Sequence, residues 1–268
     1  MKRQQKTWSK KEIDFLIVNH ENVSFKNIAK KLGRTYSSVK NKSQKLGLIR
    51  DRKYQYDFNF FKKPLKEESA YWLGFIYADG WVSGKEIGIE LKSTDFKHLK
   101  KFNISLNGNI PVTFREKEER YIKGKLARKS KLCKIRLYNV SMIYDLNALG
   151  VFSNKSLCAK FPIFDDEKIQ WHFLRGHFDG DGSISYDKRS NQLRVKIDSG
   201  SNEFKKEYAN FLKKYGIKTF FSGETVCGIT GKDSTKNFLL NIYNNATIYL
   251  DRKYEKYKTY KYLFGFNK

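Results

Sequence analysis

Two aspartates, Asp79 and Asp181, each follow an apolar run with helix-like spacing, and each stands directly before a glycine. A carboxylate at the C-terminus of a helix faces the negative end of the helix dipole. A second carboxylate close by adds repulsion between like charges. If the two helix ends meet, a positive partner is needed there, and a divalent metal ion held by oxygen ligands is the natural candidate. The glycines suit the left-handed turn that ends many helices.

The two apolar runs are copies of one pattern, which reads WLGFIYADG over residues 72–80 and LRGHFDGDG over residues 174–182. Each copy has two small residues four positions apart, Gly74 with Ala78 and Gly176 with Gly180. Residues four apart share one face of a helix, so each helix would offer a flat stripe to a second backbone. We predict that the helices pack through these stripes and bring the aspartates together, since two unrelated helix ends would not repeat the pattern.

The repeat resembles the two signature motifs of the LAGLIDADG homing endonucleases, in the single-chain form with two pseudo-symmetric halves. The resemblance extends to residues 68–74 (ESAYWLG) before the first motif, and to residues 146–156 (LNALGVFSNKS) and Phe161-Pro162 before the second. It also includes residues 249–254 (YLDRKY), and in all it covers about residues 55–262. It implies an α+β fold in residues 68–268, made of two αββαββα halves at about 68–155 and 156–268.

The resemblance also implies a set of site residues. The family keeps its metal ligands at the eighth motif position, which here is Asp79 and Asp181, and the main-chain carbonyls of Ala78 and Gly180 would assist. The implied cofactor is Mg²⁺ or Mn²⁺. Metal ions between two carboxylates can activate water, neutralise a phosphate and help the leaving oxygen depart, as phosphodiester hydrolysis requires.

Two lysines are candidates for a further catalytic role. Lys92 and Lys196 each lie on the first predicted strand after a motif, where a cation could polarise water or stabilise the transition state. Asp179 stands two residues before Asp181 and would point elsewhere on the helix, and the first motif has Tyr77 at that position. We therefore leave Asp179 outside the ligand set.

The composition favours a polyanionic partner. The chain has 268 residues with 54 Lys and Arg against 28 Asp and Glu, a formal charge of +26, and nucleic acid is the usual partner of such a protein. Three widely spaced cysteines form neither a zinc pattern nor a disulfide framework, which suits a reducing compartment. No apolar run is long enough to span a bilayer, and the start lacks the apolar stretch of a signal peptide. We expect a cytoplasmic protein (in the nucleoid or a phage-infected cell) or an organellar one, with no membrane partner and no secretion.

Residues 1–47 predict a small all-α domain of three helices, with a charged, turn-rich linker at 48–67. Residues 1–53 hold 15 Lys and Arg against 4 Asp and Glu, which is the electrostatic footprint of a DNA-binding domain. The segment resembles Myb/SANT-like helix-turn-helix modules, with Tyr36, Val39 and Leu46 on the buried side of the third helix. A basic bundle that aids solubility or binds a protein is the alternative. The expected DNA contacts of the third helix are Ser37, Ser38, Lys40, Asn41, Lys42 and Lys45.

Alternating apolar and polar residues predict two-faced strands at 86–92, 133–138 and 193–198. In the fold that the resemblance implies, the polar faces of two antiparallel sheets lie in the major groove of DNA, where basic and amide side chains can read base edges. On this interpretation Lys134, Arg136 and Arg194, with the two lysines above, face the DNA. The alternative for each residue is an ordinary solvated sheet face.

These observations predict a monomeric, site-specific homing endonuclease that makes a metal-dependent double-strand break in DNA, each half cutting one strand. Two alternatives stay open. One is a LAGLIDADG RNA maturase that assists intron splicing, for which intron RNA would be a partner. The other is a regulator that binds DNA without cutting it. Two opposed carboxylates favour cleavage, because a protein that only binds DNA has no electrostatic reason to keep them.

Overall fold

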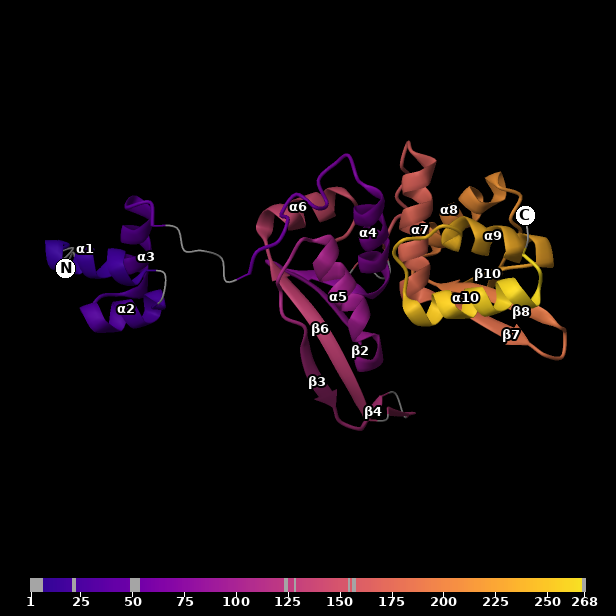
Figure 1. Cartoon of the computed structure of the whole chain (residues 1–268), viewed down its shortest axis with the longest axis horizontal. Helices are drawn as coiled ribbons and strands as arrows, with labels where there is room; N and C mark the ends of the chain where they lie inside the picture. The colour runs from indigo at the N-terminus through magenta and orange to yellow at the C-terminus, as the bar shows by residue number, and fades with distance from the viewer. Residues whose placement is uncertain are drawn as a thin grey trace. The chain divides into compact units, whose positions relative to one another are not determined.

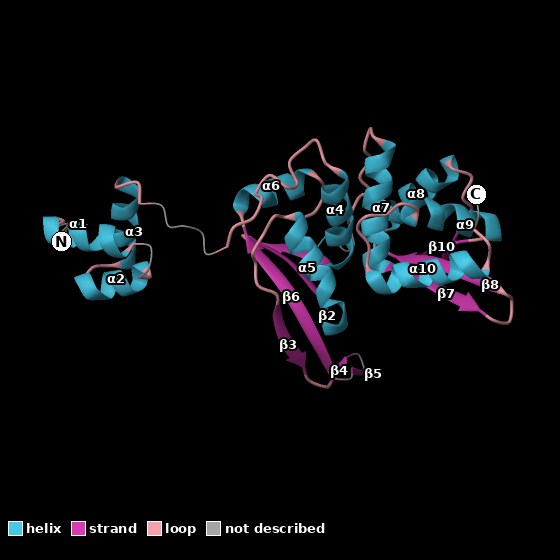
Figure 2. Ribbon diagram, in the orientation of Figure 1, coloured by secondary structure: helices cyan, strands magenta, loops and turns pink. Residues whose placement is uncertain are grey.

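The computed structural model describes residues 7–20, 23–48, 54–122, 125–127, 129–153, 155 and 158–266. The chain divides into two compact units, Met1–Tyr54 and Gln55–Lys268. Figure 1 shows the course of the chain and Figure 2 its secondary structure. No helix in the described part of the chain combines the length and the apolar character that crossing a membrane requires.

The first unit is a three-helix bundle, with α1 (Lys10–Asn19), α2 (Phe25–Leu32) and α3 (Tyr36–Lys45). Local sequence signals define each helix: Ser9 and Glu12 form a capping box at the start of α1, and Gly33 ends α2 in the left-handed conformation. The buried core consists of Leu16, Ile28, Ala29 and Val39, with Leu46 packed against it. The prediction that Tyr36 is buried is wrong. It is the first residue of α3, and its 52% exposed ring lies outside this core.

The first half of the second unit contains α4 (Glu67–Asp79), β1 (Gly80–Ser83), β2 (Glu86–Lys92), α5 (Phe96–Ser105), β3 (Thr113–Lys117), β6 (Ser130–Tyr138) and α6 (Val140–Ala148). Its sheet is antiparallel in the order β1-β2-β6-β3. A short 3₁₀ turn (Ser93–Asp95) precedes α5, and a two-stranded ribbon of β4 (Arg120–Ile122) and β5 (Lys125–Ala127) lies beyond the β3–β6 hairpin (Figure 2).

The second half repeats this order with α7 (Glu167–Asp181), β7 (Gly182–Asp187), β8 (Gln192–Asp198), α8 (Asn202–Lys214), β9 (Thr219–Ser222), β10 (Val226–Ile229) and α9 (Lys232–Tyr243). Its sheet has the matching order β7-β8-β10-β9, also antiparallel. A further helix, α10 (Asp251–Leu263), follows α9. The predicted α+β architecture of two antiparallel sheets is confirmed.

The two halves meet along α4 and α7, which lie side by side in Figure 1. A Cβ atom added at Gly176 would overlap the carbonyl oxygen of Tyr71, and one added at Gly74 would overlap that of Phe173. The helix backbones therefore touch directly at the small residues, as the spacing predicted. Any side chain larger than hydrogen at these glycines would push the halves apart.

The boundary between the two units lies later than the predicted end of the helical domain. The amide of Asp57 donates to the carbonyl of Leu106 at 2.7 Å, and the ring of Phe61 is fully buried. Residues 55–67, which were predicted to be linker, thus belong to the second unit. Their aromatic side chains supply apolar surface that the charged, turn-rich pattern had obscured.

Candidate active site

Asp79 and Asp181 are the last residues of α4 and α7, so the helix pairing brings them to the same end of the interface. The residues before them are in contact, because a Cβ at Gly180 would overlap the side chain of Ala78. Gly80 and Gly182, which follow the aspartates, have extended rather than left-handed backbones, with φ of −92° and −85°. The expected left-handed turn is wrong. Glycine is needed there because a side chain would collide with Ile76 or Phe178 one turn earlier.

The electrostatic environment disfavours charge on both aspartates. Burial is the main cause that raises the pKa of Asp79 above its usual value. Burial, together with the nearby charge of Asp79, raises the pKa of Asp181 to about 7. Two half-buried carboxylates that repel each other are stabilised by an added cation, which displaces their protons.

Two buried lysines lie beside this acidic pair. Lys155 is 6% exposed, and its Nζ donates to the carbonyl of Gly80 at 2.6 Å, just after the first motif. Lys253 is 3% exposed, and its Nζ donates to the carbonyls of Phe178, Asp179 and Gly180 at 2.6, 2.7 and 3.1 Å. Each lysine thus supplies positive charge at the negative end of a motif helix.

Burial lowers the pKa of both lysines, and the carboxylates oppose that effect. The pKa of Lys155 falls below its usual value, while Asp181 and Asp79 favour its charged form. The pKa of Lys253 falls to about 8, and the charges of Asp179, Asp79 and Asp181 resist a further fall. The acidic pair and the two lysines therefore form one electrostatic cluster, which we call the acid–lysine cluster (Asp79, Asp181, Lys155, Lys253).

The sequence did not single out these two lysines. Both lie in segments that carry the family resemblance, residues 146–156 and 249–254, but each is more than 70 positions from the carbonyls that it contacts. The candidates chosen from the sequence occupy other places. Lys92 is exposed at the end of β2, and Lys196 lies half-buried on β8 opposite Gly228. No described contact joins either to the acidic pair, and their catalytic role stays a prediction.

The oxygen atoms at this site suit a metal ion whose coordination shell is completed by the substrate. Among the residues that the structure describes, no group of three or more His, Cys, Asp and Glu side chains could hold a metal. Two carboxylates with flanking main-chain carbonyls nevertheless fit Mg²⁺, which typically takes one or two carboxylates and fills its shell with water and substrate phosphate. The carbonyl of Gly180 already accepts a hydrogen bond from Lys253, so it is a weaker candidate ligand than the carbonyl of Ala78.

The two-faced strand patterns are confirmed. Cys133, Ile135 and Leu137 are buried, while Lys134 and Arg136 lie on the other face of β6. Their cross-strand neighbours on β2 are Glu90 and Gly88, so this polar face continues over the sheet. Arg136 pairs with Glu86 at 3.7 Å, and in the second half Arg194 pairs with Asp187.

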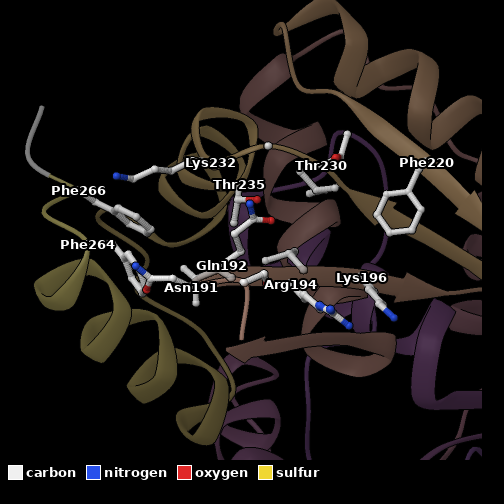
Figure 3. Close-up of a pocket in the computed structure, with 15 residues that line it drawn as sticks. Asn191, Gln192, Arg194, Lys196, Phe220, Thr230, Lys232, Thr235, Phe264 and Phe266 are labelled. Atoms are coloured by element: carbon white, nitrogen blue, oxygen red, sulfur yellow. The ribbon is translucent and has the colours of Figure 1, made fainter. Parts of the chain in front are cut away.

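A cavity of about 540 Å³ lies along β8 and the turn before it, and it is lined by residues 190–196, 229–232, Phe220, Thr235, Phe264 and Phe266. Arg194, Lys196 and Lys232 bring positive charge to it, and the ring of Phe220 lies at its side (Figure 3). Phe264 and Phe266, after α10, close the opposite side. The cavity therefore joins the basic strand surface that was predicted to face nucleic acid.

The six expected contact residues on α3 do not share one surface. Ser38, Asn41, Lys42 and Lys45 line a hollow on the three-helix unit together with Trp8, Gly33, Arg34, Thr35 and Gln44. Ser37 and Lys40 are exposed but do not line it. Lys40 and Lys42 are two residues apart on a helix and point in different directions, and the contact of all six residues with DNA stays a prediction.

The comparisons with known proteins agree with the motif pattern in the second half. Residues 169–243 match the family model described as a LAGLIDADG-like domain. No curated protein matches the chain. The N-terminal LAGLIDADG domain of DUF199/WhiA is 19% identical with a TM-score of 0.42, and the match covers 73% of this chain and 92% of that chain.

Two further solved structures are also similar to this chain. The LAGLIDADG meganuclease I-AabMI, bound to uncleaved DNA, is 11% identical with a TM-score of 0.48, covering 73% of this chain and 90% of that chain. Full-length DUF199/WhiA from Thermatoga maritima is 19% identical with a TM-score of 0.44, covering 76% of this chain. This chain spans 64% of that protein's length.

Proposed function

We propose that this protein is a site-specific endonuclease that hydrolyses both strands of double-stranded DNA with a divalent metal ion. The observation that carries the proposal is the acid–lysine cluster, in which two motif helices bring two carboxylates together and a buried lysine reaches the end of each helix. The match of residues 169–243 to a LAGLIDADG-like domain supports the same activity. The net charge of +26 supports a polyanionic substrate.

The reaction is hydrolysis of a phosphodiester. A water oxygen bonds to phosphorus, the bond from phosphorus to the leaving oxygen breaks, and that oxygen takes a proton. Mg²⁺ or Mn²⁺ held by Asp79 and Asp181 would lower the pKa of water and neutralise the phosphate. Lys155 and Lys253 would add positive charge close to the reacting phosphates, and hydrogen bonds to main-chain carbonyls fix both in place.

The two pseudo-symmetric halves suggest a division of labour. Each half contributes one motif aspartate, one lysine and one four-stranded sheet. A duplex has two antiparallel strands related by a two-fold axis, so each half would serve one strand. One chain then suffices for a double-strand break, which makes the protein a functional monomer.

The polar sheet faces and the three-helix unit would bind DNA. Lys134, Arg136, Arg194 and Lys196 lie on the strand faces, where they could contact phosphates and base edges. The hollow beside α3 would extend the recognised site, with Asn41 as the side chain best suited to read adenine. Binding through so many cations should weaken steeply as salt concentration rises.

The experiment uses the purified full chain, Mg²⁺ and a linear library of its own genomic neighbourhood with the intervening gene removed. New DNA ends are sequenced, and Asp181→Asn is run in parallel. Discrete breaks on both strands that the variant does not make support the proposal. Specific binding without breaks points to a DNA-binding regulator, and preference for an intron RNA over duplex DNA points to a maturase.

A further inference from the structure

The sixth residue of each motif, Tyr77 in the first and Asp179 in the second, stands just before the aspartates but outside the metal ligand set. Tyr77 is 6% exposed and Asp179 is fully buried. A buried carboxylate needs partners to offset its desolvation, and a buried hydroxyl needs at least one. The hydrogen-bond partners of Tyr77 and Asp179 indicate the structural role of each residue.

In the first half, Tyr77 holds the segment that carries Lys155. The Tyr77 hydroxyl donates to the carbonyl of Leu149 at 2.9 Å. The next residue, Gly150, has φ of +90°, and a Cβ there would overlap the Tyr77 oxygen. Ser153 then ties the same segment to the carbonyl of Val82 in β1 at 2.9 Å. Leu149, Gly150 and Ser153, which precede Lys155, are therefore held against the motif helix and its following strand.

In the second half, Asp179 holds the segment that carries Lys253. Its carboxylate accepts hydrogen bonds from the amide of Leu250 at 2.8 Å, from the hydroxyl of Tyr71 at 2.7 Å and from that of Tyr243 at 2.5 Å. Lys256, one turn beyond Lys253 on α10, donates to the carbonyl of Ile184 in β7 at 3.2 Å. Ile184 is the counterpart of Val82, since each is the second residue after the glycine that follows a motif.

The two halves thus reach the same result with opposite hydrogen-bond polarity. Tyr77 donates to a carbonyl, and Asp179 accepts from an amide, yet each fixes the backbone that leads to a buried lysine. We propose that Tyr77 and Asp179 are positioning residues, one for each half, that hold Lys155 and Lys253 against the acidic pair. We call the two contacts the Tyr77 latch (Tyr77–Leu149) and the Asp179 latch (Asp179–Leu250). Their catalytic purpose rests on the proposed endonuclease activity.

The latches act independently because they involve different segments. The Tyr77 latch joins α4 to the loop after α6, and the Asp179 latch joins α7 to the start of α10. The Asp179 carboxylate also binds Tyr71 of α4, and the ring of Tyr77 packs on Phe173 of α7, but each hydrogen bond to a lysine-bearing segment stays within its own half. Loosening one latch should therefore release one lysine and leave the other in place.

The first test measures lysine accessibility directly. Wild type, Tyr77→Phe, Asp179→Asn and Asp179→Leu are pulsed with an amine-reactive methylating reagent, and modification of Lys155 and Lys253 is followed by mass spectrometry. Tyr77→Phe should raise the labelling rate of Lys155 alone, and Asp179→Leu that of Lys253 alone, by about fivefold to tenfold or more, as loss of the buried hydrogen bonds implies, while Asp179→Asn should have a smaller effect. Tyr144→Phe and Asp165→Asn change exposed side chains by the same chemistry and serve as matched controls.

The amide oxygen of Asp179→Asn can still accept the two hydrogen bonds that Oδ2 receives from Tyr71 and Leu250, so Asp179→Leu, which removes all three bonds, is the decisive variant. Circular dichroism spectra and melting temperatures establish that each variant is folded. Unchanged labelling in both Tyr77→Phe and Asp179→Leu overturns the proposal. Equal rises at both lysines in either variant also overturn it, because they indicate general opening of the structure.

The second test is strand-resolved cleavage of a duplex labelled differently on its two strands. Tyr77→Phe should slow one strand and Asp179→Leu the other, each by about tenfold relative to the opposite strand. If the wild type cuts both strands and neither variant changes the ratio of the two cleavage rates, the proposed endonuclease activity is supported and the latches have no catalytic purpose. If the labelling follows prediction but the wild type leaves DNA intact, the latches hold the lysines and the proposed function is wrong.

Discussion

The two halves of the second unit share one order of helices and strands and one sheet order, but their hairpins differ in charge and in strand length. The hairpin from β3 to β6, residues 113–138, carries ten Lys and Arg against three Glu. Its counterpart from β9 to β10, residues 219–229, carries no Lys or Arg and one Glu. β6 has nine residues, whereas β9 and β10 have four each. The halves match near the acid–lysine cluster and diverge away from it.

This difference separates two physical tasks. Chemistry at two related phosphates requires similar geometry in both halves, so motif, lysine and latch recur as a set. Affinity for a polyanion depends on total charge and reach rather than on symmetry. One half can therefore carry the longer, basic hairpin for both.

The largest effect should come from the shared aspartates. Asp79→Asn and Asp181→Asn should each reduce cleavage of both strands by about a thousandfold or more, because each carboxylate is a proposed ligand for the metal that serves the reaction. Initial rates on a cognate duplex in Mg²⁺ measure this, with Asp165→Asn as control. A variant that keeps cutting one strand at the wild-type rate would show that the two aspartates act separately.

The lysines should show the division between halves. Lys155→Met and Lys253→Met keep an unbranched side chain and lose the charge, and each should slow one strand by about a hundredfold. On supercoiled plasmid carrying the site, nicked circles should accumulate before linear product. Equal slowing of both strands by either variant would mean that the lysines serve a common step.

The helix contact should be sensitive to a single methyl group. Gly180→Ala would overlap the side chain of Ala78, and we expect a loss of about 1–3 kcal/mol in the free energy of unfolding. The double variant Ala78→Gly with Gly180→Ala moves the methyl group to the other helix and should recover most of that loss. Urea unfolding of the wild type, Gly180→Ala, Ala78→Gly and the double variant gives the four free energies of this double-mutant cycle. Additive losses would contradict direct contact at this point.

The two aspartates should differ in how they link stability to pH. Because the folded-state pKa of Asp181 is about 7, above its unfolded value, the folded protein binds this proton more tightly. The contribution of Asp181 to wild-type stability should therefore fall as pH rises from about 4 to 7 and stay lower above 7. Asp181→Asn lacks this fall, so its melting temperature should exceed that of wild type at pH 8 in EDTA but not at pH 4.

Mg²⁺ provides the control for this titration. At pH 8 it should raise the melting temperature of wild type more than that of Asp181→Asn, since a ligand that binds only the folded state stabilises it. Asp79→Asn should stabilise less, because lysine and arginine charges rather than the other aspartate are the next causes after burial acting on Asp79. If Asp181→Asn and Asp79→Asn have equal melting temperatures across pH 4–8, the raised pKa assigned to Asp181 is contradicted.

The smallest effect should come from single charges on the unequal hairpins. Lys117→Ala, on β3, should weaken DNA binding a few-fold and reduce the slope of log affinity against log salt by about one, whereas Lys218→Ala, beside β9, should change neither. Fluorescence anisotropy titrations at several salt concentrations measure both. A larger loss of DNA affinity in Lys218→Ala than in Lys117→Ala would mean that the second half, rather than the first, supplies more of the DNA-binding charge.

The sequence by itself determined the features that depend on local spacing. The repeated motif predicted two helices with small-residue stripes, and the structure places Gly74 and Gly176 against the opposing backbone. Alternation predicted the faces of β2, β6 and β8, and residues 1–47 were predicted to form three helices, which correspond to α1, α2 and α3. These predictions succeeded because hydrogen bonding and side-chain direction within one helix or strand repeat with a fixed period.

Only the tertiary structure decided which lysines join the acidic pair and what the sixth motif residues do. Lys155 and Lys253 reach the cluster from loops and helix starts more than 70 residues away from the carbonyls they contact, and no local period encodes such a meeting. Asp179 looks from the sequence like a spare carboxylate, and its role follows from Tyr71, Tyr243 and Leu250, which three other segments bring to it. A buried polar group takes its function from partners that folding supplies, and the chain order of those partners does not reveal them.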